Sequence, residues 1–157
     1  MGTIFDRIRL RPTQLRTVAD RRLGDAQCLC DSNNNERANG AIYLAGFVVE
    51  CLLKARLLEK FRWLQGAHSP ERLSTNQQRI WSLFYRSHDL DEILVHVPEV
   101  LHSIARFEQQ ENGPLAQRLK AICDEWTIFA RYSPKSLDIG KARLFVAHIR
   151  RLKPCLQ

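Results

Sequence analysis

The chain has 157 residues, with 24 Lys and Arg against 17 Asp and Glu, a net charge of +7 and a pI near 9.5. This length allows one domain with its own core, and 45% hydrophobic residues with 26% charged ones is the composition of a globular protein, which excludes a disordered chain. Only 7 Gly and 6 Pro disfavour a sandwich or barrel, which needs many tight turns.

The first two predicted elements are helices. Residues 13–30 repeat apolar side chains at helical spacing after Pro12, which suits a helix start. Residues 37–61 form the most apolar segment, so this second helix is expected at the centre of the fold. A loop is predicted over 62–73, where Gly66 and Pro70 interrupt the pattern.

Shorter helices follow the loop. Ser74 and Gln77 have the spacing of a capping box before one of them, and Asp89 with Glu92 forms a second capping pattern. A further helical stretch is expected over 99–108, after a break or kink at Pro98.

Two longer helices end the chain. One begins at about Pro114 and includes Trp126, and the last is capped by Ser136 and ends at about Lys153. No segment alternates like a strand. The predicted fold class is therefore all-α, an antiparallel up-and-down bundle of four to five main helices plus a short extra helix. We expect a single domain over 1–157, with a core of about 14–152 and terminal extensions at 1–12 and 154–157.

The apolar runs and the cysteine spacing predict the location of the protein and its cofactors. The longest apolar run, 41–49, is too short to cross a bilayer, and charged residues interrupt the first eleven positions, so no leader and no membrane segment are expected. The five cysteines are scattered without a Cys-x-x-Cys pair. We therefore expect reduced thiols in a cytoplasmic protein, with no metal and no cofactor.

The basic excess leaves two interpretations open. It is carried by 18 Arg against 6 Lys, and the planar guanidinium suits phosphate, which favours RNA or a nucleotide as partner. The same charge would also serve solubility alone.

The second helix carries a semi-polar stripe of Tyr43, Phe47, Glu50 and Lys54. Charges in the middle of a central helix need a partner, because burying them unpaired is costly. One interpretation is an ordinary pair between Glu50 and Lys54, one turn apart. The other is that Glu50 reaches Arg131 or His88 across the bundle, in a polar cluster that either specifies the fold or binds a ligand.

Three motifs in chain order resemble the HEPN family (higher eukaryotes and prokaryotes nucleotide-binding). The segment AIYLAGFVVECLLKA at 41–55 resembles the second helix of that family. His88-Asp89-Leu90 resembles the HDL opening of its third helix, and Arg131-Tyr132 resembles the RY near the end of its fourth. The resemblance covers about residues 14–152.

The resemblance implies a helical bundle that often forms homodimers and is often encoded beside a small nucleotidyltransferase, in toxin–antitoxin, defence or RNA-processing settings. Many members are metal-independent RNases with an Arg-x(4–6)-His motif. In such a site the His acts as general acid or base and the Arg stabilises the charge on phosphorus. Carried over to this sequence, the catalytic candidates are His88 and Arg131.

This sequence departs from the RNase motif. Its one Arg-x4-His match, Arg143 and His148, lies in the last helix with four apolar residues between, where the family does not normally place the pair. Side chains five residues apart are also about 140° apart around a helix. The pair is therefore the weaker alternative for a catalytic site.

The remaining candidates also have structural interpretations. Asp89 fits a helix N-cap, His88 fits a turn histidine that is bonded to the backbone, and Tyr132 fits a packing residue. If the residues instead form a site, Asp89 and Tyr132 would join Glu50 and Lys54 in the polar cluster.

Three functions follow. The first is an RNA- or nucleotide-binding HEPN-like domain, active as a toxin-like or defence-associated endoribonuclease. The second is a non-catalytic HEPN module, with a nucleotidyltransferase, antitoxin or other chain as partner. The third is a basic RNA-binding protein without a pocket, whose binding would fall steeply with salt.

Overall fold

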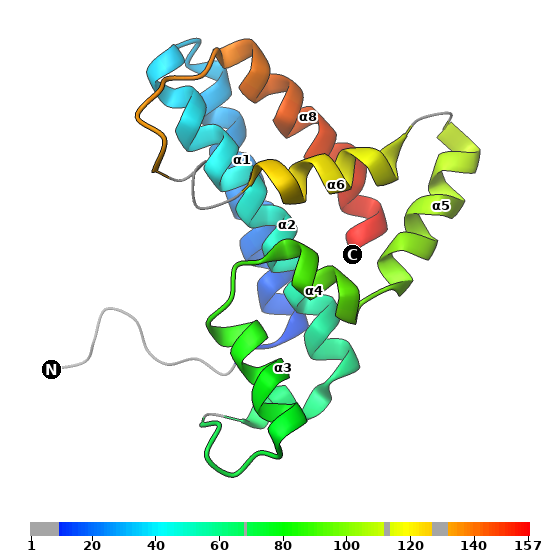
Figure 1. Ribbon diagram of the computed structural model, residues 1–157. Coiled ribbons are helices and arrows are strands. Elements are labelled where there is room, and N and C mark those ends of the chain that lie inside the picture. Colours follow the sequence, from blue (N-terminus) through cyan, green and yellow to red (C-terminus); the bar gives the residue numbers. More distant parts are fainter. Residues whose placement is uncertain (1–9, 68, 112–113, 127–131) are drawn as a thin grey trace, which may run out of the picture.

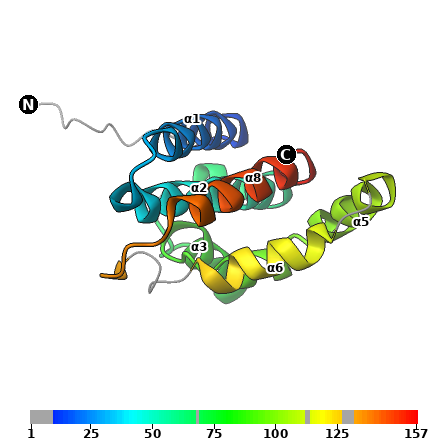
Figure 2. The same ribbon diagram turned by 90° about the horizontal axis from the view of Figure 1, so that it is seen from above.

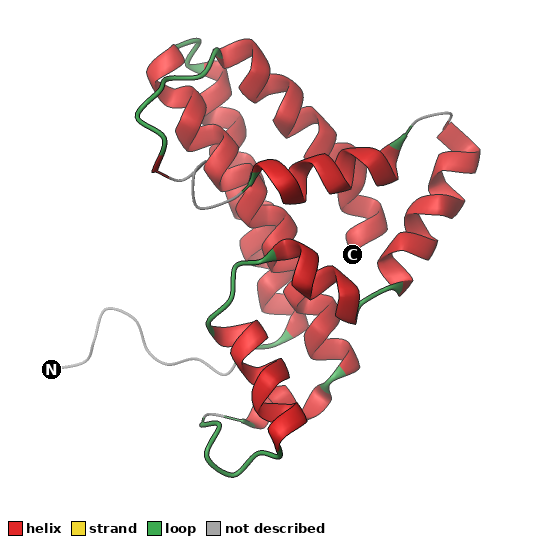
Figure 3. Ribbon diagram, viewed as in Figure 1, coloured by secondary structure: helices red, strands yellow, loops and turns green. Residues whose placement is uncertain are grey.

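The computed structural model describes residues 10–67, 69–111, 114–126 and 132–157. In the described ranges, 79% of the structure is helical and no strand occurs, so the predicted all-α class is confirmed (Figure 3). The elements, in chain order, are α1 (Pro12–Asp31), η1 (Asn35–Arg37), α2 (Ala38–Lys60), η2 (Arg62–Gly66), α3 (Thr75–Tyr85), α4 (Leu90–His96), α5 (Glu99–Glu111), α6 (Leu115–Glu125) and α8 (Ile139–Leu156), with η marking 3-10 helices (Figure 1).

Helix α2 is the centre of the fold, as its apolar sequence predicts. It packs most extensively on α1 and next on α8, and these three helices lie side by side in Figure 2. Its buried residues occupy most of its circumference, including both members of the Glu50–Lys54 pair. Because the middle of α2 is buried on nearly all sides, its polar side chains there, Glu50 and Lys54, lie inside the protein.

The middle of the chain does not continue this side-by-side arrangement. Helices α3 and α4 lie at one end of α2, α6 runs obliquely across α8, and α5 projects away from the rest (Figure 1). Helix α5 still contacts α6 and α8. An up-and-down order of all the main helices therefore stays a prediction.

The predicted capping patterns in the middle of the chain are confirmed. Ser74 accepts a hydrogen bond from the backbone N–H of Gln77, and the Gln77 side chain accepts one from the N–H of Ser74, which is a complete capping box. Asp89 caps α4 by accepting from the N–H of Glu92 at 2.9 Å. Helix α4 ends before Pro98, as expected for a residue that cannot continue the hydrogen-bond ladder.

Two predicted boundaries are wrong. Helix α8 is capped by Asp138, not Ser136, because the Asp138 carboxylate accepts the N–H groups of Gly140 and Lys141. The helix also continues through Pro154 to Leu156 instead of ending at Lys153, since Cys155 and Leu156 are buried in the core and their packing outweighs the proline's missing donor. The predicted loop over 62–73 also contains η2.

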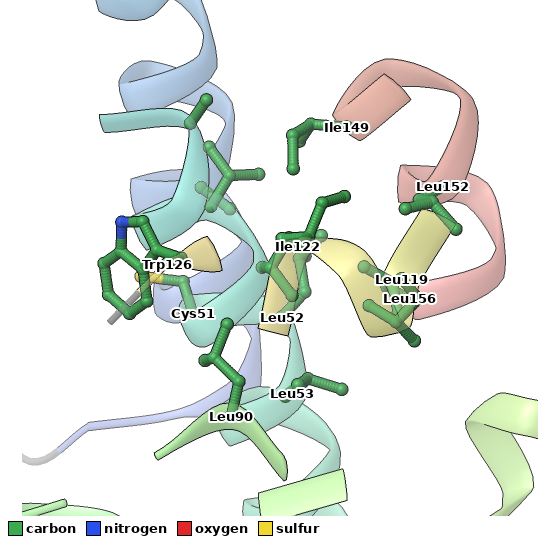
Figure 4. Packing of buried hydrophobic residues seen from close by; sticks show 14 of the residues in the cluster. Cys51, Leu52, Leu53, Leu90, Leu119, Ile122, Trp126, Ile149, Leu152 and Leu156 are labelled. Atoms are coloured by element: carbon green, nitrogen blue, oxygen red, sulfur yellow. The ribbon is translucent and has the colours of Figure 1, made fainter. Parts of the chain in front are cut away.

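Side chains from α2, α4, α6 and α8 meet in one core (Figure 4). Trp126, at the end of α6, lies against α2 so closely that a Cβ on Gly46 would come within 2.0 Å of the indole ring. The indole N–H donates to the carbonyl of Tyr43 at 3.1 Å. This contact anchors the end of α6 to α2.

Candidate functional site

The candidate site begins with a buried carboxylate. Glu50 lies near the middle of α2, and its side chain is 3% exposed. Lys54, one turn later and 11% exposed, places its Nζ 2.8 Å from Glu50 Oε1. Because each ion neutralises the other, the helix carries two charges into the core without a net charge there.

The pair is completed by the connection between α3 and α4. His88 places Nδ1 at 2.9 Å from Oε1 and 3.1 Å from Oε2 of Glu50. Lys54 Nζ also donates to the backbone carbonyl of Ser87 at 2.8 Å. We call Glu50, Lys54, Ser87 and His88 the Glu50 cluster. Of the two partners for Glu50 that the sequence left open, the structure brings His88 to it.

The geometry sets the tautomer of His88. A carboxylate only accepts hydrogen bonds, so the ring nitrogen facing Glu50 is assigned the proton, and Nε2 carries the lone pair of the neutral ring. The His88 side chain is 52% exposed, whereas its carboxylate partner is buried. The cluster is thus closed at the Glu50 end and open to solvent at the imidazole.

The local backbone explains why His88 is held in this place. Asp89 caps α4, and the Ser87 hydroxyl accepts from the N–H of Asp89 at 3.1 Å, so both neighbours of His88 are tied into the turn. Lys54 Nζ also lies 5.8 Å from the centre of the Phe84 ring, a cation–π distance. The imidazole therefore projects from a turn that is fixed on both sides.

Two buried thiols lie beside this region. Burial, reinforced by Glu50, raises the pKa of Cys51 to about 12. Burial, with the carboxylates of Asp91 and Asp124 adding to it, raises the pKa of Cys123 to about 12. Both side chains remain neutral thiols near neutral pH and do not act there as thiolate nucleophiles.

The remaining predicted site residues are Tyr132, Arg131 and the pair Arg143 and His148. Tyr132 is 77% exposed, and Arg131 lies outside the described residues. Arg143 donates to the carbonyl of Cys30 at 3.0 Å, at the end of α1, and so holds α8 to α1. His148 lines a cavity between α6 and α8 instead. The structure does not bring Arg143 and His148 together at one site.

Sequence reasoning missed two features of the site. The Ser87 carbonyl, which accepts from Lys54, leaves no side-chain signal in the sequence. The cavity beside His148 also escaped notice, because its lining combines residues of two helices. Within the ranges that the structure describes, no group of three or more His, Cys, Asp or Glu lies close enough to hold a metal ion.

No family model matches the chain, and comparisons with curated proteins and with solved structures also found no match. Among the described helices, none has the length and apolarity that crossing a membrane requires. The site is therefore interpreted from its own geometry.

Proposed function

We propose that this protein is a HEPN-like, up-and-down helical domain that binds and cleaves RNA without a metal, with His88 as the proton-transfer group. The observation that carries the proposal is the half-exposed imidazole of His88, whose Nδ1 is held by the buried Glu50 carboxylate. The net charge of +7 supports a polyanionic substrate. The resemblance at 41–55, 88–90 and 131–132 supports the same family and a homodimer. The scattered cysteines, without a Cys-x-x-Cys pair, support a cytoplasmic location.

The chemistry follows from the tautomer. Nε2 of neutral His88 takes the proton from a ribose 2′-hydroxyl, and the 2′-oxygen then attacks the adjacent phosphorus. The bond to the leaving 5′-oxygen breaks, and that oxygen gains a proton from water, while the His88 imidazolium returns its own proton to water. The products are a 2′,3′-cyclic phosphate and a 5′-hydroxyl. Glu50 stabilises the imidazolium that forms, as a carboxylate does behind a catalytic histidine. In this proposal Arg131 stabilises the charge on the phosphoryl oxygens.

The test is cleavage of a labelled RNA by the pure protein in EDTA. His88→Gln should slow cleavage at least about 100-fold, the usual contribution of a positioned acid or base. His102→Gln, which changes an exposed histidine on α5, is the matched control and should cleave at the parent rate. RNA left intact by the parent protein, or equal rates for His88→Gln and the parent, would refute the proposal.

A second candidate is a non-catalytic HEPN module whose Glu50 cluster only holds α2 to the α3–α4 connection. The bond from Lys54 to the Ser87 carbonyl favours it, because that bond joins the two elements without involving solvent. Such a module would bind a nucleotidyltransferase or antitoxin chain. It predicts that Glu50→Ala lowers the melting temperature and disrupts partner binding through misfolding; a variant with parent stability that has lost RNA binding would contradict it.

A further inference from the structure

A cavity of about 390 Å³ lies between α6 and α8, separate in its lining residues from the Glu50 cluster. Ile122 and Phe145 contribute buried apolar side chains to it, and Leu144, which is 63% exposed, lies where it meets solvent. Its volume lies in the range of pockets that bind small organic molecules. The cavity is therefore large enough to hold an apolar body.

The ionisable residues that line this cavity are all basic. Arg118 from α6 and Lys141 from α8 are cations, and His148 from α8 gains a positive charge when protonated. None of the nine lining residues, all of which the structure describes, is Asp or Glu. A concave site with cations and no acid attracts anions and repels metal ions.

One atom of Arg118 lacks the partner that its chemistry requires. Nη1 of Arg118 is buried from solvent and has no hydrogen-bond partner within the described part of the chain. A charged donor removed from water is costly unless it is paired, so an unsatisfied one in a native protein calls for an explanation. An oxyanion in the cavity gives Nη1 a partner once the Arg118 side chain rotates toward it, because a guanidinium binds carboxylate and phosphate with two parallel hydrogen bonds.

We propose that the α6–α8 cavity binds a small amphipathic oxyanion, a phosphate or carboxylate group attached to an apolar body. The oxyanion pairs with the Arg118 guanidinium, after a rotation of that side chain that presents Nη1, and Lys141 adds a second positive charge. The apolar body lies against Ile122 and Phe145. The proposal does not depend on RNA cleavage at His88.

The test is isothermal titration of the full chain with matched probes. Naphthyl phosphate and naphthoate carry one apolar body with the two oxyanions, naphthalene methanol lacks the charge, and inorganic phosphate lacks the body. At least one naphthyl anion should bind at least tenfold more tightly than the alcohol and than inorganic phosphate, and which anion binds better identifies the oxyanion. If neither naphthyl anion exceeds both of those controls tenfold, the proposal is wrong.

Variants then locate the site. Arg118→Met should weaken binding of the preferred probe at least tenfold while leaving the melting temperature unchanged or higher, because it removes a buried donor atom that has no partner. Arg79→Met, the same change on the exposed face of α3, should leave binding at the parent level. Filling the cavity with Ala121→Phe should also abolish binding. Parent-level binding by Arg118→Met, or by Ala121→Phe, would overturn the assignment. As a test of independence from the proposed RNA cleavage, His88→Gln should bind the probe at the parent level whether or not it cleaves RNA.

Discussion

Replacing Gly46 by alanine should destabilise this protein, although the same change in an ordinary helix stabilises it. Gly46 lies inside α2, where alanine is favoured over glycine by about 1 kcal/mol. An added Cβ would, however, lie 2.0 Å from Cδ1 and 2.1 Å from Nε1 of Trp126. No side-chain adjustment short of moving the indole relieves such a contact.

The magnitude follows from what the indole loses. Trp126 is 2% exposed, and expelling a buried aromatic side chain costs about 3–5 kcal/mol, as its truncation to alanine does. Subtracting the helix-propensity gain of about 1 kcal/mol leaves a net loss of about 2–4 kcal/mol for Gly46→Ala. Such a loss is a large fraction of the roughly 5–15 kcal/mol that stabilises a typical domain.

The assay is urea unfolding followed by far-UV circular dichroism, with Gly24→Ala as the matched control. Gly24 also lies inside a helix, α1, but nothing lies within 4 Å of the position its Cβ would take, so this variant should gain about 0.5–1 kcal/mol. In a Trp126→Leu background, Gly46→Ala should lower the unfolding free energy much less than it does in the parent. If Gly46→Ala is as stable as the parent, or if its cost persists without the indole, the reasoning is refuted.

Two further predictions concern the buried polar and thiol groups. Lys54→Met leaves the Glu50 carboxylate buried without its ammonium partner and should lower stability by about 3–5 kcal/mol, measured by thermal melts. The double variant Lys54→Met with Glu50→Leu removes both charges and should recover most of the lost stability. Equal stability of Lys54→Met and the parent would contradict this reasoning. Because the pKa values of Cys51 and Cys123 are raised from 9.0 to about 12, the unfolded chain loses these thiol protons at lower pH than the folded protein does. Stability should therefore hold below about pH 9 and fall above it by up to about 1.4 kcal/mol per pH unit for each thiol, and this fall should be smaller in Cys51→Ala. Alkylation of the native protein near pH 8, followed by mass spectrometry, should modify the exposed Cys28 before Cys51 or Cys123.

The capping positions that were predicted correctly carry their signal within four residues. Ser74 with Gln77, and Asp89 with Glu92, satisfy backbone donors of their own helix, so their sequence spacing alone determines the contact. The central position of α2 could also be predicted from the sequence, because a helix that is apolar nearly all round must be buried.

The start of α8 shows where local signals fail. The segment before it is held by residues about 100 positions earlier. The Asn39 side chain donates a hydrogen bond to the carbonyl of Lys135 and accepts one from the N–H of Leu137. The Asn35 side chain accepts one from the N–H of Ile139. These bonds fix where the chain turns into the helix, so Asp138 caps it and Ser136 does not. Local spacing could not choose between the two because it contains neither asparagine.

The sequence by itself determined an all-α protein and showed that α2 carries charges that need partners. Only the tertiary structure decided that Glu50 pairs with His88, 38 residues away, while Trp126 packs onto Gly46 and Arg118 faces a cavity. Periodicity reports which face of a helix is buried, but a contact between helices depends on how each is rotated and where they cross. That relative placement results from packing of the whole core, and no single segment encodes it.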